Sequence, residues 1–507
     1  MASRAPRERY LQRMIADDSA LYSAYAARDP RFDGVFYIGV TSTGIYCRPV
    51  CTARTPRASN CRFFTSAEAA EKAEFRPCLR CRPELAPGNA PVDDARRLAT
   101  LLVQRIDEGM LDDGARLDVV ARKFGWSSRQ IRRIVQKELG VSPIELVLTR
   151  RLLLAKQLLT ETSMPVSQVA YSSGFSSLRR FNDAFSERYR MPPTRFRKGV
   201  ESSQPEGRAD VLELQLSYRP PFAWTQLLAF LGARATAGVE LVAADHYART
   251  VRLGEHVGWM RVNNRKDKRS LTLELSQSLA PVLPALLGRV RQLFDLNARP
   301  DVIASQLQSH PALRHSVKRT PGLRVPGAFD GFELAVRAVL GQQITVKAAT
   351  SIAGRFAKAF GTPIDTPYSD LATIFPRAER IADASLDEIA SLGIIRARAT
   401  AIIALARAMS DGTLALEPGS DPDNTIVQLQ TLPGIGPWTA NYIAMRALRW
   451  PDAFPKEDVV IRKRLGGVSA GRAEELSHEW KPWRSYATLH LWHIDQKTEA
   501  TRRRSVS

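Results

Sequence analysis

The cysteines are the feature of this sequence that most constrains its fold. All five lie between residues 47 and 81 of a chain of 507 residues. Cys47 and Cys51 have the spacing C-x3-C, and Cys78 and Cys81 have the spacing C-x2-C. Two closely spaced pairs are typical of a tetrahedral zinc site, and an odd total argues against a disulfide framework. The sequence therefore predicts one zinc ion bound by these four cysteines, while Cys61 in NCRFF is expected to face a small core.

Charge and composition narrow the class of protein. The chain has 73 Lys and Arg against 52 Asp and Glu, which gives a formal net charge of +21 and a pI near 10.1. This excess indicates a polyanionic partner, with nucleic acid as the leading candidate, although a merely basic globular protein would share it. Hydrophobic residues at 44% and charged residues at 25% exclude wholesale disorder. No apolar run is long enough to span a bilayer and the N-terminus lacks a signal core, so we expect a cytoplasmic protein without a membrane partner.

The length and two polar stretches predict several domains. A chain of 507 residues exceeds one ordinary core. Residues 84–94 and 198–210 are rich in Pro, Gly or Ser and are typical of linkers. The predicted divisions are 1–88, 91–200, 208–295 and 296–495, followed by a disordered tail at 496–507.

The residues around the cysteines carry a family signature. FDGVFYIGVTSTGIYCRPVC and FRPCLRC, within about residues 25–85, resemble the N-terminal domain of the Ada family of adaptive-response proteins. The resemblance implies that Cys47 accepts a methyl group from a DNA methylphosphotriester, with Cys51, Cys78 and Cys81 as its co-ligands on zinc. It assigns residues 1–88 to a small α+β zinc methyl-acceptor domain.

Methyl transfer to this site is expected to change its charge. Zinc keeps cysteine sulfur as a nucleophilic thiolate. Four thiolates on Zn²⁺ carry a formal charge of about −2, and methylation of one leaves about −1, so repulsion from DNA phosphates falls. We therefore expect methylated protein to bind DNA more tightly, with Arg48 beside Cys47 acting on phosphates. The alternative is that the two N-terminal parts are merely linked and methylation changes nothing.

The middle segment repeats a basic helical pattern. Residues 117–143 and 166–193 each contain Gly, an aromatic residue, Ser-Ser and then a basic helix. The paired units resemble the DNA-binding domains of the AraC family over about 100 residues, which implies an all-α double helix-turn-helix domain at 91–200 that binds promoter DNA and RNA polymerase. A basic helical bundle with a solvated charged face is the alternative. The candidate DNA contacts are Arg129, Arg132, Arg133, Arg179 and Arg180.

The last 300 residues change character partway along. Residues 211–290 mix the alternating segments VLELQLSY and LTLELS with the apolar helix WTQLLAFLGARA, which is typical of an α+β subdomain. Beyond about residue 290 the pattern is helical. The turn LPGIG lies between two helical runs, as in a helix-hairpin-helix, where Gly434 and Gly436 would let backbone N–H groups approach a DNA phosphate. An ordinary glycine-containing turn is the alternative.

The sequence downstream of this turn is more specific. PKEDVVIRKRL and KPWRSYATLHLWH follow it, and from about residue 218 onward the chain resembles AlkA-type 3-methyladenine DNA glycosylases. The resemblance implies that Asp458 is catalytic and that Trp438, Tyr442 and Trp492 line the base pocket. On spacing alone the aromatic residues would be helix core. The family's α+β subdomain would occupy 208–295, and its helix-hairpin-helix glycosylase domain 296–495.

The implied reaction is hydrolytic excision of alkylated purines, of the 3-methyladenine and 7-methylguanine type, from double-stranded DNA. Trp438 stands where related strand-nicking enzymes carry a Schiff-base lysine, so we expect a monofunctional enzyme. Because no cysteine lies beyond residue 81, no iron–sulfur cluster is expected. A bulky apolar residue often fills the gap left by the flipped base, but this chain offers Gln343, with Gln342 beside it, and Pro437 replaces an often basic residue.

These resemblances predict a multidomain, mainly α fusion that repairs alkylated DNA and regulates that repair, in a bacterial cytoplasm close to the nucleoid. The Pro-Cys-His-Arg motif of O6-methylguanine methyltransferases is absent, so that activity is not expected. One alternative is a methylation-sensing activator whose glycosylase part only binds DNA; retention of Asp458 and its aromatic partners argues against it. Another is a repair enzyme whose N-terminal half is only a tether, against which the intact cysteine pairs argue.

Overall fold

The computed structural model describes residues 18–87, 127–198, 210–418 and 420–493. The chain is multidomain and mainly helical, as expected. It divides into two compact units, one of residues 1–220 with 265–288 and one of residues 221–264 with 289–507. The predicted tail and the first helix of the first helix-turn-helix unit lie outside the described residues. The domain boundaries inferred from the sequence stay predictions.

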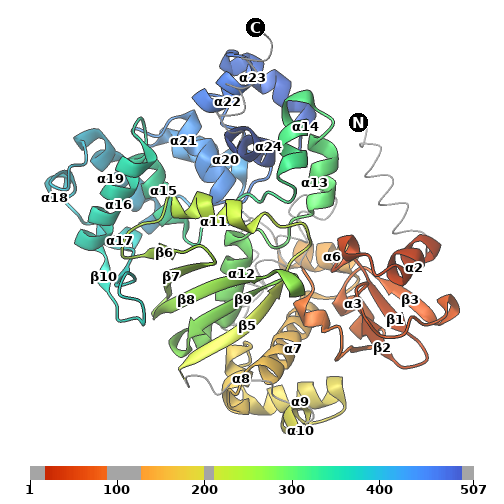
Figure 1. The fold of residues 1–507 in the computed structure, drawn as a ribbon. Coiled ribbons are helices and arrows are strands. Elements are labelled where there is room, and N and C mark those ends of the chain that lie inside the picture. The colour runs from red at the N-terminus through yellow and green to blue at the C-terminus, as the bar shows by residue number, and fades with distance from the viewer. Residues whose placement is uncertain (1–17, 88–126, 199–209, 419, 494–507) are drawn as a thin grey trace. The chain divides into compact units, whose positions relative to one another are not determined.

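The N-terminal part of the first unit is built on a small sheet (Figure 1). Its elements are α2 (Asp18–Ala26), β1 (Tyr37–Val40), β2 (Ile45–Cys47), β3 (Cys61–Phe64), α3 (Ala67–Lys72), β4 (Arg76–Pro77) and the 3-10 turn η3 (Pro83–Leu85). The strand order is β3-β1-β2-β4, antiparallel except for the parallel pair β2 and β4. Gly39 lies in the middle of β1, where an added Cβ would come within 2.8 Å of the Phe64 ring. A glycine there lets the aromatic core close over the strand.

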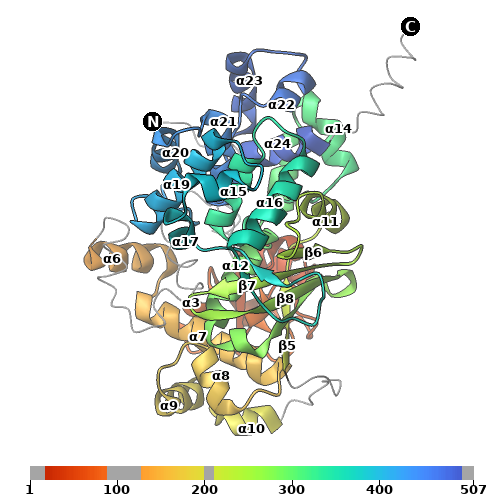
Figure 2. The same ribbon diagram turned by 90° about the vertical axis from the view of Figure 1, so that its left-hand side faces the viewer.

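Five helices follow between residues 127 and 198, the next part of this unit that the structure describes: α6 (Ser128–Leu139), α7 (Pro143–Glu161), α8 (Val166–Ser172), α9 (Leu178–Tyr189) and α10 (Pro193–Lys198). The long helix α7 starts at a capping box, in which the Ser142 side chain accepts from the Glu145 backbone while the Glu145 carboxylate accepts from the Ser142 backbone. Ser177 caps α9 by accepting from the Arg180 backbone N–H. The second helix-turn-helix unit is therefore α8 and α9, and it is packed against α7 (Figure 2).

The first unit also contains an antiparallel strand pair from the middle third of the chain. These strands are β5 (Val211–Ser217) and β9 (Ser270–Ser276), the segments VLELQLSY and LTLELS of the sequence. Their leucines alternate with polar residues, and Leu214 and Leu273, which pair across the strands, are fully buried. The alternation that predicted these strands thus matches a sheet with one buried face.

The second unit combines three neighbouring strands and the short antiparallel pair β10 (Thr362–Pro363) and β11 (Thr373–Ile374) with most of the helices. Strands β6 (Glu240–Val242), β7 (His246–Leu253) and β8 (His256–Arg265) are successive antiparallel neighbours. The helices that follow or flank them are α11 (Trp224–Gly232), α12 (Leu283–Leu293), α13 (Pro300–Leu307), α14 (Pro311–Arg319), α15 (Gly331–Leu340), α16 (Val346–Phe360), α17 (Ala378–Ala382), α18 (Leu386–Ala390), α19 (Arg396–Ser410), α20 (Pro422–Thr431), α21 (Pro437–Arg446), α22 (Val459–Arg464), α23 (Ala470–Ser477) and α24 (Arg484–His493).

Helix α15 is the centre of the helical layer in this second unit. It contacts α16, α19 and α21, as Figures 1 and 2 both show. Eight of its ten residues are buried, because its neighbours cover most of its surface. Helices α20 and α21 pack against each other and place the LPGIG turn between them. Among the residues that the structure describes, none of the helices is long and apolar enough to cross a bilayer.

Candidate functional sites

The four cysteines predicted to bind zinc come together at one end of the N-terminal sheet. Cys47 ends β2, Cys51 follows in the next turn, and Cys78 and Cys81 follow β4. The parallel pairing of β2 with β4 brings the two pairs together, since the Cys78 N–H donates to the Tyr46 carbonyl at 3.0 Å. The four Sγ atoms lie within 4.8 Å of one another, and Cys47, Cys51 and Cys78 are buried. We call these four residues the zinc centre, and we call the part of the first unit that holds them, residues 18–87, the zinc domain.

The donors of the zinc centre fit a zinc ion. Four sulfurs from two short-spaced pairs form the ligand set of a closed structural site. The backbone N–H of Arg48 donates to the Cys81 sulfur at 3.3 Å, a contact that favours the thiolate form. Cys61 lies outside this group, on β3, where it packs against the core beside Phe36 and Ile38.

Arg48 does not have the position that the sequence suggested. We expected it to act on DNA phosphates, but its side chain is buried and paired with the Asp33 carboxylate, with Nε 2.7 Å from Oδ1. Its Nη1 also donates to the Cys81 carbonyl at 3.1 Å. The expectation was wrong because a buried guanidinium needs a carboxylate and carbonyl acceptors, and this one finds them inside the zinc domain.

Helix α3 of the zinc domain meets α7 and α9 through buried acidic side chains. Glu68 pairs with Arg150 of α7 at 2.7 Å, and Glu71 lies 3.4 Å from Arg188 of α9. Glu71 also accepts hydroxyl hydrogen bonds from Tyr46 and Thr149. Burial raises the pKa of Glu71 to about 7, against the opposing pull of Arg188. Part of the positive charge of the middle segment is thus neutralised by the zinc domain.

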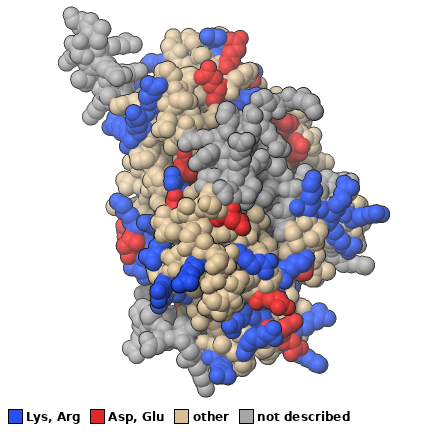
Figure 3. All heavy atoms as spheres, turned by 90° about the vertical axis from the view of Figure 1, so that its right-hand side faces the viewer, with Lys and Arg blue, Asp and Glu red and all other residues tan. Residues whose placement is uncertain are grey.

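The arginines predicted to contact DNA are exposed. Arg129, Arg132 and Arg133 lie on α6, and Arg179 and Arg180 lie at the start of α9. Exposed Lys and Arg side chains also stand out at several places on the face drawn in Figure 3. Their exposure is compatible with phosphate or base contacts, and their roles stay predictions.

In the second unit, Asp458 is held by the side chains of two of the aromatics predicted to line the base pocket. Its Oδ2 accepts from the indole Nε1 of Trp438 at 2.9 Å, and its Oδ1 accepts from the indole Nε1 of Trp492 at 3.2 Å. Asp458 also caps α22, because Oδ1 accepts from the Ile461 N–H at 2.9 Å. Its side chain is 8% exposed. The carboxylate therefore has a fixed orientation and accepts hydrogen bonds from three N–H donors.

The three predicted pocket aromatics adjoin one another. The rings of Trp438 and Tyr442 stack with 5.3 Å between centroids and 6° between planes, and Tyr442 lies 6.3 Å from Trp492. The Tyr442 hydroxyl accepts from Nη1 of the buried Arg446 at 2.6 Å. Burial alone would raise the pKa of Tyr442, but Arg446, Arg234 and Arg337 together lower it. A single group of contacting side chains is thus formed by Trp438, Trp492 and Asp458, and Tyr442 lies next to it.

The helix-hairpin-helix turn has the expected backbone. Gly434 has φ of 75°, which favours glycine, and Gly436 caps α21. A Cβ added to Gly436 would meet no other atom within 4 Å among the described residues. Pro437 fits as the first residue of α21, where a helix needs no N–H donor. The turn therefore presents an accessible helix start.

The two glutamines predicted to contact DNA, Gln342 and Gln343, differ in their hydrogen bonding and exposure. The Gln342 amide donates to the Gly434 carbonyl at 2.9 Å and to the Thr439 hydroxyl at 3.0 Å, so it braces the hairpin. Gln343 is exposed and has φ of 55°, an uncommon conformation for a residue other than glycine. Such conformations gather at functional sites.

Sequence reasoning missed the buried charged residues. Glu71, Glu84, Lys156 and Arg446 were not singled out, since each falls in a segment where charge is ordinarily solvated. One signal was available for Arg446, which lies four residues after Tyr442 on the same helix face. For the other three, the partners come from distant segments.

Four family models match consecutive parts of the chain. They are the metal binding domain of Ada at residues 20–84, a helix-turn-helix domain at 120–199, the AlkA N-terminal domain at 213–330, and the HhH-GPD superfamily of base excision DNA repair proteins at 336–485. These matches follow the order of parts that the sequence predicted.

Known proteins match both the whole chain and its parts. The "probable bifunctional transcriptional activator/DNA repair enzyme AlkA" of Mycobacterium tuberculosis is 38% identical over 94% of this chain and 97% of its own length. "DNA-3-methyladenine glycosylase 2" of Escherichia coli is 38% identical over 55% of this chain and 96% of its own length. "Bifunctional transcriptional activator/DNA repair enzyme AdaA" of Bacillus subtilis is 29% identical over 36% of this chain and 84% of its own length. The chain therefore belongs to the family of AlkA-type bifunctional transcriptional activators and DNA repair enzymes.

Proposed function

We propose that this protein hydrolytically removes alkylated purines from double-stranded DNA and also takes methyl groups from DNA methylphosphotriesters onto Cys47. The names of its relatives and its four family models support this assignment. The observation that carries it is the Asp458 carboxylate held by the Trp438 and Trp492 indoles, on the same chain as the four-cysteine zinc centre.

For base excision, Asp458 is the catalytic residue. The flipped nucleotide loses its base as the N-glycosidic bond breaks and the bonding electron pair leaves with the purine. The ionised carboxylate stabilises the positive charge that develops on the sugar, and water then adds to C1′ and loses a proton. An alkylated purine carries positive charge, so the pocket aromatics Trp438, Tyr442 and Trp492 can favour it by about 0.5–2 kcal/mol through cation–π contact.

Excision requires the base to leave the helix. The turn at Gly434 and Gly436 would bind a backbone phosphate beside the lesion, at the start of α21. Gln343 would enter the gap left by the flipped base. Its exposed side chain and its left-handed backbone conformation support this role. Gln342 would keep the turn in place. Because Trp438 stands in the place of a Schiff-base lysine, the product is an abasic site in an unbroken strand.

For methyl transfer, Cys47 is the acceptor. A bond forms between its sulfur and the methyl carbon while the methyl C–O bond breaks, and the phosphodiester leaves as an anion. Cys47, Cys51, Cys78 and Cys81 would hold one zinc ion, which would keep their sulfurs deprotonated. No iron–sulfur cluster takes part. The reaction occurs once per molecule, because the thioether is not turned back into a thiolate.

Methylation of Cys47 would link repair to transcription. It removes one negative charge from a domain whose helix α3 pairs with α7 and α9 of the helix-turn-helix domain. The exposed arginines Arg129, Arg132, Arg133, Arg179 and Arg180 would then bind promoter DNA with less opposition and present the protein to RNA polymerase. This activity belongs in a bacterial cytoplasm at the nucleoid, with 1–88, 91–200, 208–295 and 296–495 as the functional domains.

The switch predicts a salt-dependent gain in affinity. After reaction with methylphosphotriester DNA, the protein should bind a promoter fragment more tightly at low salt, and the gain should shrink as salt rises. Removal of one negative charge should steepen the salt dependence of binding by about 0.9 log units per tenfold change in salt. Fluorescence anisotropy of a fragment selected by binding measures this, with Cys47→Ser protein, treated identically, as the control. Equal affinities before and after the reaction at both salts would leave Cys47 as a repair residue only.

A further inference from the structure

The loop that carries the second cysteine pair is clamped by two buried cations. Arg48, from the zinc domain itself, donates to the Cys81 carbonyl at 3.1 Å. Lys156, from helix α7 of the DNA-binding domain, donates from Nζ to the Cys78 carbonyl at 3.3 Å. The Lys156 side chain is only 1% exposed. A residue of one domain thus reaches the backbone of a zinc ligand in another.

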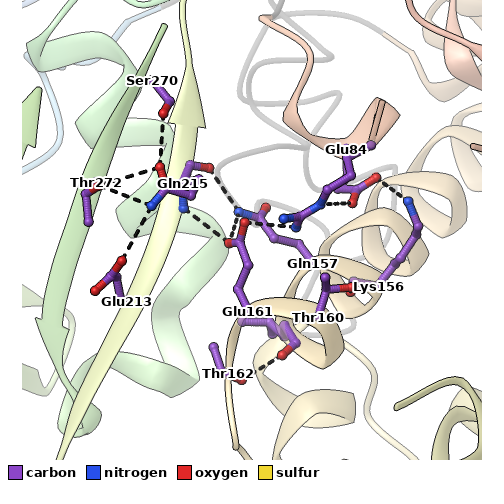
Figure 4. A network of polar contacts seen from close by, with 12 residues as sticks. Glu84, Lys156, Gln157, Thr160, Glu161, Thr162, Glu213, Gln215, Ser270 and Thr272 are labelled. Atoms are coloured by element: carbon purple, nitrogen blue, oxygen red, sulfur yellow. Dashed lines mark hydrogen bonds and ion pairs between the residues drawn. The ribbon is translucent and has the colours of Figure 1, made fainter. Parts of the chain in front are cut away.

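Lys156 is fixed in this position by a carboxylate. Its Nζ lies 2.6 Å from Glu84 Oε2, and the Glu84 side chain is also 1% exposed. Glu84 in turn accepts from Arg82 Nε at 3.0 Å, and Arg82 Nη2 lies 2.8 Å from Glu161, which ends α7. Arg82 directly follows the ligand Cys81. Figure 4 shows Glu84 and Lys156 pointing toward each other across the junction of the two domains.

The same face of α7 continues to the strand pair of the first unit. The Gln157 amide donates to Glu161 at 2.8 Å and to the Gln215 carbonyl of β5 at 3.0 Å, and the Gln215 N–H donates to Glu161 at 3.2 Å (Figure 4). Helix α7 therefore has hydrogen bonds both to the loop of the zinc domain and to strand β5. This leaves Lys156 little freedom to move away from the zinc loop.

We propose that Lys156 is a positioning residue of the zinc centre, supplied by the DNA-binding domain. Its hydrogen bond to the Cys78 carbonyl orients the Cys78–Cys81 loop, and the ion pair with Glu84 keeps its ammonium group in place. Groups that hold metal ligands in place without touching the metal typically change its affinity 10-fold to 100-fold when removed. The inference rests on the proposed zinc site and adds a residue that the four-cysteine pattern does not contain.

The test compares zinc affinity among variants of the full chain, measured by competition with a chromogenic chelator. Lys156→Met, which keeps the stem and removes the ammonium, should bind zinc about 10-fold to 100-fold more weakly than wild type. Lys156→Arg can still donate to both Cys78 and Glu84, and it should restore most of the loss. Lys72→Met is the matched control, because Lys72 also crosses from the zinc domain, to the Gly140 carbonyl at 3.1 Å, without touching the zinc loop. Its zinc affinity should stay within about twofold of wild type.

The outcomes separate this proposal from its alternatives. Wild-type affinity in Lys156→Met, or an equal loss in Lys72→Met, would overturn the positioning role. If Lys156→Met fails to fold, Glu84→Gln decides: the Gln amide oxygen can still accept from Lys156, which keeps its bond to the Cys78 carbonyl, so the zinc affinity should stay close to that of wild type. A loss in Glu84→Gln as large as 10-fold to 100-fold would overturn the proposal. Wild-type protein that binds no zinc would instead refute the zinc site itself.

Discussion

Asp458→Asn should abolish base release and leave DNA binding largely intact. The amide carries no negative charge to stabilise the developing sugar cation, and it would turn an N–H₂ group toward one of the two indole donors. Loss of such an electrostatic contribution typically costs about 10²–10³-fold in rate. Folding should survive, because Asn caps helices as well as Asp does and can still accept from the Ile461 N–H. Release of 3-methyladenine from alkylated DNA measures the effect.

A second helix cap in the same unit supplies the control. Asp421 caps α20 by accepting from the Asn424 N–H at 2.9 Å. Asp421→Asn makes the same chemical change away from the pocket, so its release rate should equal that of wild type. The wild-type product strand should stay unbroken until alkali is added. Near-normal base release by Asp458→Asn would remove Asp458 from the mechanism.

Cys51→Ala should unfold the zinc domain. A structural zinc site contributes on the order of 10 kcal/mol or more to folding, and three cysteines do not complete a tetrahedral site. Cys51 is 1% exposed, so its loss also removes a core side chain. We expect zinc content to fall from one ion per chain toward zero and residues 25–85 to become sensitive to protease. Base release should persist, because Asp458 and its aromatic partners belong to the other unit.

Cys61→Ala tests the specificity of that result. Cys61 lies on β3, outside the group of four sulfurs, so its variant should keep one zinc ion per chain. Metal analysis after gel filtration gives both stoichiometries. Loss of zinc from Cys61→Ala, or full retention by Cys51→Ala, would contradict the ligand assignment.

The sequence was most informative where chemistry depends on local spacing. Two short cysteine pairs predicted a group of four sulfurs, which β2 and β4 bring within 4.8 Å. Gly434 and Gly436 predicted a tight turn at a helix start, and the structure has it. The resemblance to AlkA-type enzymes pointed to Asp458 and its aromatics, which the structure places in hydrogen-bond contact.

Buried charge was beyond the reach of such patterns. Glu84 and Lys156 are 72 residues apart, and each by itself is typical of a solvated surface. The positive charge of the middle segment indicated a DNA-binding domain, yet Arg150, Lys156 and Arg188 of that segment pair with acidic residues of the zinc domain. The net charge of a segment gives the number of basic and acidic side chains, but it does not show which of them pair with each other in the fold. The prediction that Arg48 contacts DNA phosphates failed for the same reason, because its partner Asp33 could not be identified from the sequence.

The central claim is that one chain performs two repair reactions. The most direct measurement incubates the full-length protein with DNA carrying radiolabelled methyl groups on both bases and phosphates, and follows both products. The account predicts free 3-methyladenine released in many turnovers, together with at most one labelled methyl per chain, lost in Cys47→Ser but kept in Asp458→Asn. Released bases without labelled protein, or labelled protein without released bases, would contradict it.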